Sequence, residues 1–454
     1  MSQDCPTLKI KDGKLKGFMS QADDPSAVPV YNYLNIPFGK PPTGKRRFLA
    51  PEKSEPWDGI LDATKPTHHP PQDNEIGHMY ADYLPMKDTL GAPTERQSED
   101  CLRLNVFTPS VEKSSKLAVM VWIVGGGYMR GMAGIYDGVA LSGMNNVVTV
   151  SPNYRANALG FLSLGKNSKV PGNNALRDII LALEWVRDNI ESFGGNPSNV
   201  TIFGESAGGV MTELLMMSPL SRDLIHKAIS MSGSPLAPTV FGGGEATREV
   251  LLKALNINAS EPDAILEKLQ EVPVDVLIEV QKKFYGPYAF QPIVDGHVIT
   301  DTPENISSTG QRHKIPFLTG VCDSECAGIL AFVLPPRYME GSSKEEVKAV
   351  FEEAFKLRHP NTACDKVVDR LMAAYSDVAA DNDKYKYSRV YAEMAGDSIF
   401  VVPAIVSATA HSAMQCPTYF YYITKPIEFN HSESNGPGIK NKLDFVKCDH
   451  AAWR

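Results

Sequence analysis

Strand-like and helix-like hydrophobic patterns alternate along this chain. Short continuous apolar runs, typical of strands buried on both faces, occur at 117–124, 147–150, 200–203, 228–231 and 316–321. Apolar residues at helical spacing predict a helix over 173–191, and further helical patterns fill about 344–377 and 385–411. Strands that alternate with helices indicate an α/β fold, in which a mostly parallel sheet carries helices on both faces.

The chain shows no break that would divide it into domains. It has 454 residues, without an internal repeat, a low-complexity tract or a clear linker. Two loop-like stretches run from about 65 to 97 and from about 425 to 440. We expect one domain that spans residues 1–454, because α/β enzymes often run long as a single unit.

Composition and charge exclude several classes of protein. Hydrophobic residues make up 43% and charged residues 22%, which are globular values and exclude a disordered, collagen-like or coiled-coil chain. The net charge of −8 and the lack of a basic patch argue against a nucleic-acid partner. No apolar run approaches the roughly 18 residues of a membrane span, so we expect no transmembrane segment.

The N-terminal sequence and the cysteine content bear on location. The first residues contain no apolar stretch of signal-peptide length, and seven cysteines are too few for a disulfide scaffold. These features predict a cytoplasmic protein as the sequence is written. If the N-terminus is incomplete, a secreted protein or one of the ER lumen is expected instead.

The strongest chemical pattern is the G-x-S-x-G pentapeptide GESAG at 204–208. It directly follows the apolar run at 200–203 and precedes small residues that begin a helical pattern, which is the strand–turn–helix setting of a nucleophile elbow. A serine on such a tight turn needs small neighbours, and the helix N-terminus behind it favours developing negative charge. The pattern predicts that Ser206 is a nucleophile, against the alternative of a glycine-rich turn with an incidental serine.

A second glycine cluster, residues 125–127, directly follows the apolar run at 117–124. An acyl-transfer enzyme needs N–H donors aimed at the oxyanion of its tetrahedral intermediate, and glycine lets the backbone approach closely. Phosphate binding is the competing use of such a loop, but the Lys-Ser/Thr pair of a P-loop is absent. We expect an oxyanion hole formed by the backbone N–H groups of Gly126, Gly127 and Ala207.

An acid and a histidine should follow the serine in the chain order that accompanies this elbow. Asp323 and Glu325 come just past the apolar run at 316–321, and both are candidates for the acid on position alone. Four histidines lie beyond them, at positions 359, 411, 431 and 450. His450 is best placed to act as the base, because it lies in a turn that closely follows a strand-like piece at 443–446.

Long stretches of the sequence match the signatures of one known family. Residues 193–208, FGGNPSNVTIFGESAG, match an active-site signature throughout, and residues 99–109, EDCLRLNVFTP, match a second signature except at Arg103. The chain thus closely resembles the type B carboxylesterase and cholinesterase family of α/β-hydrolases. Other family-like pieces are NIPFGKPPTGKRRF (35–48), NYRANALGFLS (153–163), PGNNALRD (171–178), PIVDG (292–296) and GDSIFVVP (396–403).

The resemblance implies an α/β-hydrolase fold, a carboxylic ester hydrolase and roles for particular residues. Glu325 falls on the family's acid position and His450 on its catalytic histidine, which with Ser206 would complete a triad. Glu205 and Ser232 match positions that lie near the histidine and the acid, respectively. The substrate implied is a small-molecule ester.

The resemblance also implies two structural salt bridges, which join Arg47 to Glu99 and Arg155 to Asp178. A Pro-rich loop carries the only dense histidine cluster, at positions 68, 69 and 78. We expect a solvated loop there rather than a metal site. The interpretation as a whole requires no cofactor and no metal.

Two other functions are compatible with the family pattern. One is a catalytically weak or inactive cholinesterase-like adhesion or binding protein, which the presence of all three triad residues disfavours. The other is a hydrolase of acylglycerols or sterol esters that resembles bile-salt-activated lipase. Only four residues follow His450, where the family continues into further elements. This predicts a domain truncated after the histidine, with low stability and weak activity.

Overall fold

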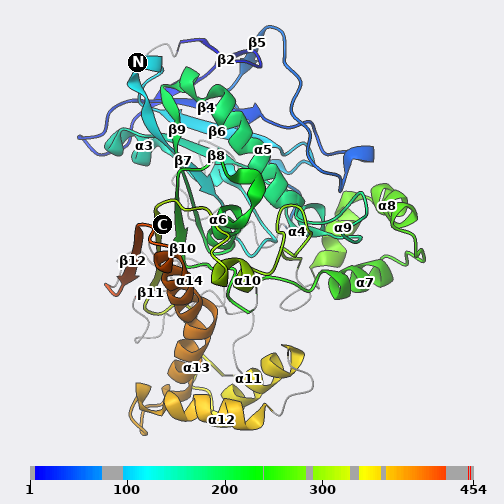
Figure 1. Ribbon diagram of the computed structural model, residues 1–454, viewed down its shortest axis with the longest axis vertical. Helices are drawn as coiled ribbons and strands as arrows, with labels where there is room; N and C mark the ends of the chain where they lie inside the picture. Colours follow the sequence, from blue (N-terminus) through cyan, green and yellow to red (C-terminus); the bar gives the residue numbers. More distant parts are fainter. Residues whose placement is uncertain are drawn as a thin grey trace.

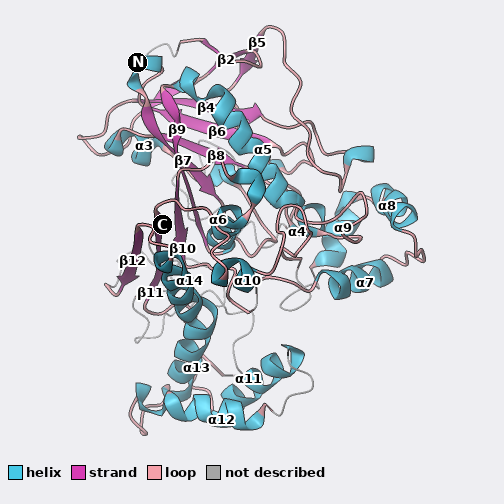
Figure 2. Cartoon of the chain, in the orientation of Figure 1, coloured by secondary structure: helices cyan, strands magenta, loops and turns pink. Residues whose placement is uncertain are grey.

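A large mixed sheet forms the centre of the computed structural model, and helices pack around it (Figure 2). The structure describes residues 6–73, 96–238, 240–282, 290–327, 337–358 and 364–425, together with Cys448 and His450. Within these residues the sheet has nine strands, in the order β12-β11-β10-β9-β7-β8-β6-β4-β3. Their bounds are Phe18–Ser20 (β3), Val30–Pro37 (β4), Arg103–Thr108 (β6), Leu117–Ile123 (β7), Val148–Pro152 (β8), Gly195–Glu205 (β9), Lys227–Met231 (β10), Phe317–Cys322 (β11) and Thr418–Ile423 (β12).

The sheet is mostly parallel, as the alternating pattern predicts. Strands from β12 to β8 pair in parallel, and β6, β4 and β3 continue the sheet in antiparallel pairs. Each of the five apolar runs lies within a strand, to within one residue, but β9 begins five residues before its run. The polar residues that open β9 are less buried than the run, so an apolar pattern marks only the inner part of this strand. A small second sheet contains Leu8–Lys9 (β1), Lys14–Lys16 (β2) and Ile60–Asp62 (β5).

The helices fill the connections between strands and extend beyond the sheet (Figure 1). The predicted helix at 173–191 is α5, and the helical pattern at about 344–377 contains two helices, α11 and α12. The bounds are Val139–Asn145 (α3), Asn157–Phe161 (α4), Asn174–Asn189 (α5), Ala207–Met217 (α6), Gly244–Ala254 (α7), Pro262–Glu271 (α8), Val274–Gln281 (α9), Pro303–Ser308 (α10), Lys344–Arg358 (α11), Asp365–Ala374 (α12), Lys386–Gly396 (α13) and Val402–Ala413 (α14).

The pattern at 385–411 forms one long helical column, in which a π-helical turn at Asp397–Val401 joins α13 to α14 (Figure 1). Among the described residues, this stretch alone is long and apolar enough to cross a membrane by length and composition, with a mean hydropathy of 1.3. Of its most apolar window, 56% is buried inside the molecule. Core helices of globular proteins pass the same test, so the stretch is weak evidence for a membrane span.

The parallel strands bring several loops to one edge of the sheet. Ile123 at the end of β7 pairs with Gly204 near the end of β9, and Met231 of β10 pairs with both Glu205 of β9 and Gly320 of β11. The segments that follow these four strands therefore begin side by side. They are the glycine loop, the pentapeptide, the turn at Ser232 and the loop with the candidate acids.

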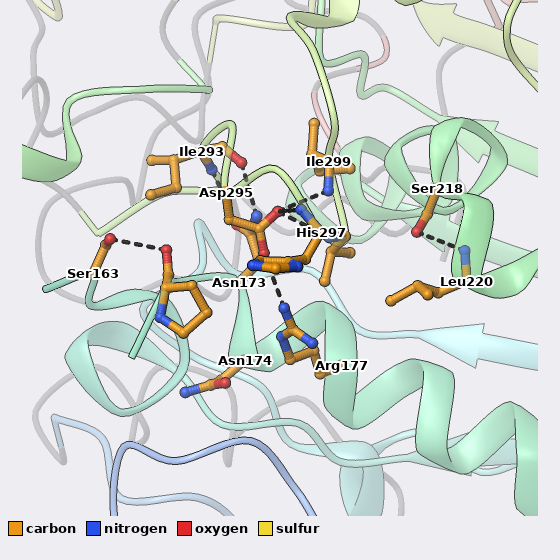
Figure 3. Close-up of polar contacts among 12 residues, drawn as sticks. Ser163, Asn173, Asn174, Arg177, Ser218, Leu220, Ile293, Asp295, His297 and Ile299 are labelled. Carbon is orange, nitrogen blue, oxygen red and sulfur yellow. Dashed lines mark hydrogen bonds and ion pairs between the residues drawn. The ribbon is translucent and has the colours of Figure 1, made fainter. Parts of the chain in front are cut away.

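Two family-like segments, PGNNALRD and PIVDG, meet beside α5 (Figure 3). Asp295 accepts three backbone hydrogen bonds, from the N–H groups of residues 297–299, and pairs with Arg177 at 3.2 Å. The amide side chain of Asn173 bonds both backbone groups of Ile293, at 2.7 and 3.0 Å. These contacts hold the loop around Asp295 against the start of α5.

Candidate active site

Ser206 lies on the turn between β9, which ends at Glu205, and α6, which begins at Ala207. Its backbone angles, φ 57° and ψ −125°, cost a residue with a side chain on the order of 1–3 kcal/mol. Backbones also meet closely here, since a Cβ on Gly204 would lie 2.5 Å from the carbonyl oxygen of Gly208. Ser206 itself stays partly exposed while both of its neighbours are buried. The serine is thus presented to solvent on a strained turn.

The glycine loop at 125–127 packs directly against this turn. A Cβ on Gly125 would lie 3.3 Å from the Cβ of Ser206. Gly126 and Gly127 have φ values of 122° and 63°, and no hydrogen bond among the described residues uses the N–H of either. Ala207 is the first residue of α6, so its N–H has no acceptor within the helix. The three expected oxyanion donors therefore belong to two adjoining backbone segments.

Glu325 and His450 form a buried pair behind the serine turn. The Nδ1 of His450 lies 2.7 Å from Oε2 of Glu325. The other carboxylate oxygen of Glu325 accepts hydrogen bonds from the hydroxyl of Ser232, at 2.6 Å, and from the N–H of Cys322, at 2.8 Å. Of the two candidate acids, Glu325 thus contacts the histidine, with both of its oxygens engaged. Asp323 contacts the backbone of Cys448 instead.

Glu205 contacts the other ring nitrogen of His450. The Nε2 of His450 lies 3.0 Å from Oε1 of Glu205, and no hydrogen bond joins Nε2 to Ser206 among the described residues. Burial by itself lowers the pKa of His450, but the two carboxylates outweigh it and raise the pKa to about 10. In this arrangement each ring nitrogen faces a carboxylate oxygen, which favours the charged form of the ring.

An aromatic ring that the sequence analysis did not single out completes the surroundings of His450. Phe400 lies on the π-helical turn, and its ring centroid is 4.5 Å from that of His450, with the ring planes inclined by 37°. π-Helical turns occur often at functional sites, because the extra residue redirects a side chain. Phe400 is part of the family-like segment GDSIFVVP, which was the one available signal for it.

Of the other histidine candidates, only His411 lies among the described residues, and it contacts a different part of the molecule. His411 is buried in α14, where its Nε2 bonds the carbonyl oxygen of Ile315 at 2.8 Å. Residues 359 and 431 lie outside the described residues, as does the strand-like piece at 443–446. Cys322 and Cys326, which flank the acid, are buried as thiols.

Both implied salt bridges occur as ion pairs away from the serine turn. Arg47 contacts Glu99 through two hydrogen bonds of 2.6 Å each. Arg155 and Asp178 are almost wholly buried and share bonds of 2.9 and 2.8 Å, and Asp178 also accepts the backbone N–H of Arg155. Their geometry is typical of pairs that hold segments of the fold together.

The expectation of a solvated histidine loop is wrong for His69. This side chain is fully buried, and burial lowers its pKa to about 3. Residue 78 lies outside the described residues. Within the described residues, no three His, Cys, Asp or Glu side chains are grouped as a metal site would require.

Comparisons with known proteins show what this chain is similar to. Residues 4–452 match the model of the carboxylesterase family. The chain is 33% identical to a medium-chain fatty acyl-CoA hydrolase precursor of Anas platyrhynchos, over 98% of this chain and 78% of that protein. It is 35% identical to carboxylesterase 1C of Rattus norvegicus, over 92% and 74% of the two chains. It is 34% identical to pyrethroid hydrolase Ces2e of the same species, over 98% and 75%.

Proposed function

Because this chain belongs to the carboxylesterase family, whose members are serine hydrolases acting on carboxylic esters, we propose that it hydrolyses esters through an acyl-enzyme on Ser206. The observation that carries the proposal is the buried Glu325–His450 pair, 2.7 Å apart, beside a serine on a strained turn. Nucleophile, base and orienting acid are the parts that acyl transfer needs.

The proposed reaction follows from these positions. The Oγ of Ser206 attacks the ester carbonyl, and the Nε2 of His450 accepts the proton and returns it to the leaving alcohol. Glu325 holds Nδ1 and stabilises the imidazolium. The N–H groups of Gly126, Gly127 and Ala207 bind the oxyanion. Water then attacks the acyl-enzyme with His450 as base, which releases the acid and restores the serine.

The contact between His450 and Glu205 adds one step to this scheme. A base must be unprotonated and must face the serine, whereas Nε2 faces Glu205 at 3.0 Å. Before it can serve Ser206, the imidazolium therefore releases the proton on Nε2 to solvent water, and the ring gives up its contact with Glu205. Contacts of this kind often rearrange when substrate binds. Glu205 would hold the resting, charged ring in place.

The test is turnover of a p-nitrophenyl acyl ester. We expect a burst of p-nitrophenol equal to the enzyme concentration, and a loss of turnover of at least ~1,000-fold in Ser206→Ala. An organophosphate should label Ser206 stoichiometrically in the unmodified chain. Unchanged turnover in Ser206→Ala would contradict the proposal, and a folded chain without labelling would favour the adhesion-protein alternative.

The names of the relatives suggest which substrates to compare. A series of esters of increasing acyl length, a medium-chain acyl-CoA thioester, a pyrethroid and an acylglycerol would rank the candidate classes by kcat/KM. A preference for acylglycerols or sterol esters would favour the lipase-like alternative.

A further inference from the structure

The loop that carries His450 is attached to the loop that carries the acid at a second point. Cys448 lies two residues before His450, and its backbone N–H donates to Oδ1 of Asp323 at 3.0 Å. Its carbonyl oxygen accepts the backbone N–H of Ser324, also at 3.0 Å. Both backbone groups of Cys448 are therefore held by the two residues that precede Glu325.

Asp323 is itself firmly placed. Its backbone N–H donates to the carbonyl oxygen of Ile423 at 3.0 Å, which extends the β11–β12 ladder by one bond. The hydroxyl of Ser324 bonds Oδ1 of Asp323 at 3.0 Å and so fixes the direction of the carboxylate. The anchor for Cys448 is thus continuous with the end of the central sheet.

Glu325 and Asp323, both in the loop after β11, contact different parts of the segment that carries His450. Glu325 contacts the ring of His450, whereas Asp323 contacts the backbone upstream of it. Phe400 and Glu205 also contact only the ring. Ring contacts restrain the tip of the side chain, whereas the bonds to Cys448 restrain the backbone two residues before it. Without the Asp323 carboxylate, the backbone N–H of Cys448 would lose this acceptor.

We propose that Asp323 is a positioning residue, which fixes the backbone of the His450 loop through the N–H of Cys448. The proposal rests on the function proposed above. It also explains why two acidic residues stand close together after β11, since one orients the ring and the other orients the loop. Misplacement of a catalytic group by about 1 Å can lower a rate on the order of 100-fold.

The central experiment compares Asp323→Ala with Asp323→Asn. Alanine removes the acceptor, whereas asparagine keeps an acceptor oxygen and loses the charge. Activity is expressed per organophosphate-titrated Ser206, so that misfolded protein is not counted. We expect kcat to fall on the order of 10- to 100-fold in Asp323→Ala with KM within about twofold, and to stay within about threefold in Asp323→Asn.

A matched control removes the same kind of contact elsewhere. Asp24 also accepts a backbone N–H, that of Ser26 at 2.7 Å, in an exposed loop before β4. Asp24→Ala should leave kcat and KM unchanged. If Asp323→Asn is as impaired as Asp323→Ala, the role of Asp323 is its charge, and the proposal is overturned. It is also overturned if kcat per titrated serine is unchanged in Asp323→Ala.

A second measurement does not depend on activity. Hydrogen exchange of a peptide that contains Cys448 reports directly on its N–H, which the Asp323 carboxylate protects. We expect exchange to be faster on the order of tenfold in Asp323→Ala but not in Asp323→Asn. Equal exchange in all variants would show that Asp323 does not hold the N–H of Cys448, and the proposal would be overturned. If the unmodified chain hydrolyses no ester, the proposed function fails, while the exchange result still decides whether Asp323 fixes this backbone.

Discussion

At the scale of single residues, the proposed chemistry depends on the balance of charge around His450. Two carboxylates flank the ring, one on each nitrogen, and Phe400 covers one side of it. Chain order left Asp323 and Glu325 open as the acid, and the family signatures favoured Glu325 with His450, two side chains that the structure brings into contact. Neither chain order nor the signatures could predict that Nε2 faces Glu205, because that depends on the orientation of a ring and not on the order of residues.

The pH dependence of hydrolysis should report this balance. A base with a pKa of about 10 makes kcat/KM of the unmodified chain rise with pH well above 6.5, the value for an unperturbed imidazole. Glu205→Gln removes a negative charge, which favours the neutral ring. The acid limb should therefore move to lower pH by about 1–3 units. A profile of kcat/KM against pH provides the measurement.

The matched control for this prediction is Glu245→Gln, since Glu245 is an exposed residue of α7. The acid limb of the kcat/KM profile of Glu245→Gln should coincide with that of the unmodified chain. Limbs that coincide near pH 6.5 in all three proteins would show that Glu205 does not set the charge of His450.

At the scale of secondary-structure elements, the strands were predictable and the irregular turns were not. An apolar run predicts a strand such as β7, because a strand buried on both faces leaves a continuous apolar sequence. The π-helical turn at Asp397–Val401 inserts one residue into a helical repeat, and the pattern over 385–411 averages across it. Phe400 could therefore be assigned to a helix, but not to the histidine that it contacts.

A buried ionic cluster links α6, which follows the serine, to α14. Arg312 lies 3.4 Å from Glu213 of α6 and bonds the hydroxyl of Ser407 of α14 at 3.0 Å, and that hydroxyl donates to Glu213. Both charged side chains have no exposed surface. Burial raises the pKa of Glu213 and lowers that of Arg312 in spite of their attraction, so loss of water outweighs pairing.

Removing one charge of this cluster should lower the free energy of unfolding more than replacing both charged residues with apolar ones. Arg312→Met leaves Glu213 buried without its cation and should lower the free energy of unfolding by about 3–5 kcal/mol in urea titrations. The double variant Arg312→Met/Glu213→Leu should recover most of that loss, because no buried charge remains. Lys169→Met, which breaks an exposed pair with Asp263, should not move the unfolding midpoint. A double variant as unstable as the single one would contradict this account.

At the scale of the whole molecule, the site is assembled from segments far apart in sequence. The family match confirms the expected α/β-hydrolase fold and the expected family. That fold brings the ends of β7, β9, β10 and β11 together. Phe400, on the turn that joins α13 to α14, adds its ring contact with His450 from a later part of the chain. Figure 1 shows the helical column that contains this turn. Signatures could predict which segments meet, whereas a contact such as that of Asp323 with Cys448 depends on the backbone path of two loops, which no signature specifies.

Arg47 joins three distant parts of the molecule. Besides its two bonds to Glu99, its guanidinium donates to the carbonyl oxygens of Gln270 and Val272, at the end of α8. Lysine cannot reproduce this planar fork of donors. Arg47→Lys should therefore lower the free energy of unfolding by about 1–3 kcal/mol, measured by urea titration.

The neighbouring Arg46 gives the control. It makes one exposed hydrogen bond, to the carbonyl oxygen of Pro41, and Arg46→Lys should leave the unfolding curve in place. Equal curves for both variants would mean that the contacts of Arg47 add nothing to the stability of the fold.

Close backbone packing at the serine turn limits which residues the glycine positions around it can accept. Added Cβ atoms would lie 2.1 Å from the Ile123 carbonyl oxygen at Gly208, 2.2 Å from that of Ser206 at Gly233 and 2.4 Å from that of Glu205 at Gly125. Main-chain atoms cannot move away as the end of a flexible side chain can. A larger residue at any of these three glycines would therefore disrupt the turn, whether or not the chain is catalytic. The fold itself therefore requires glycine at these positions, whereas only the proposed chemistry requires the hydroxyl of Ser206.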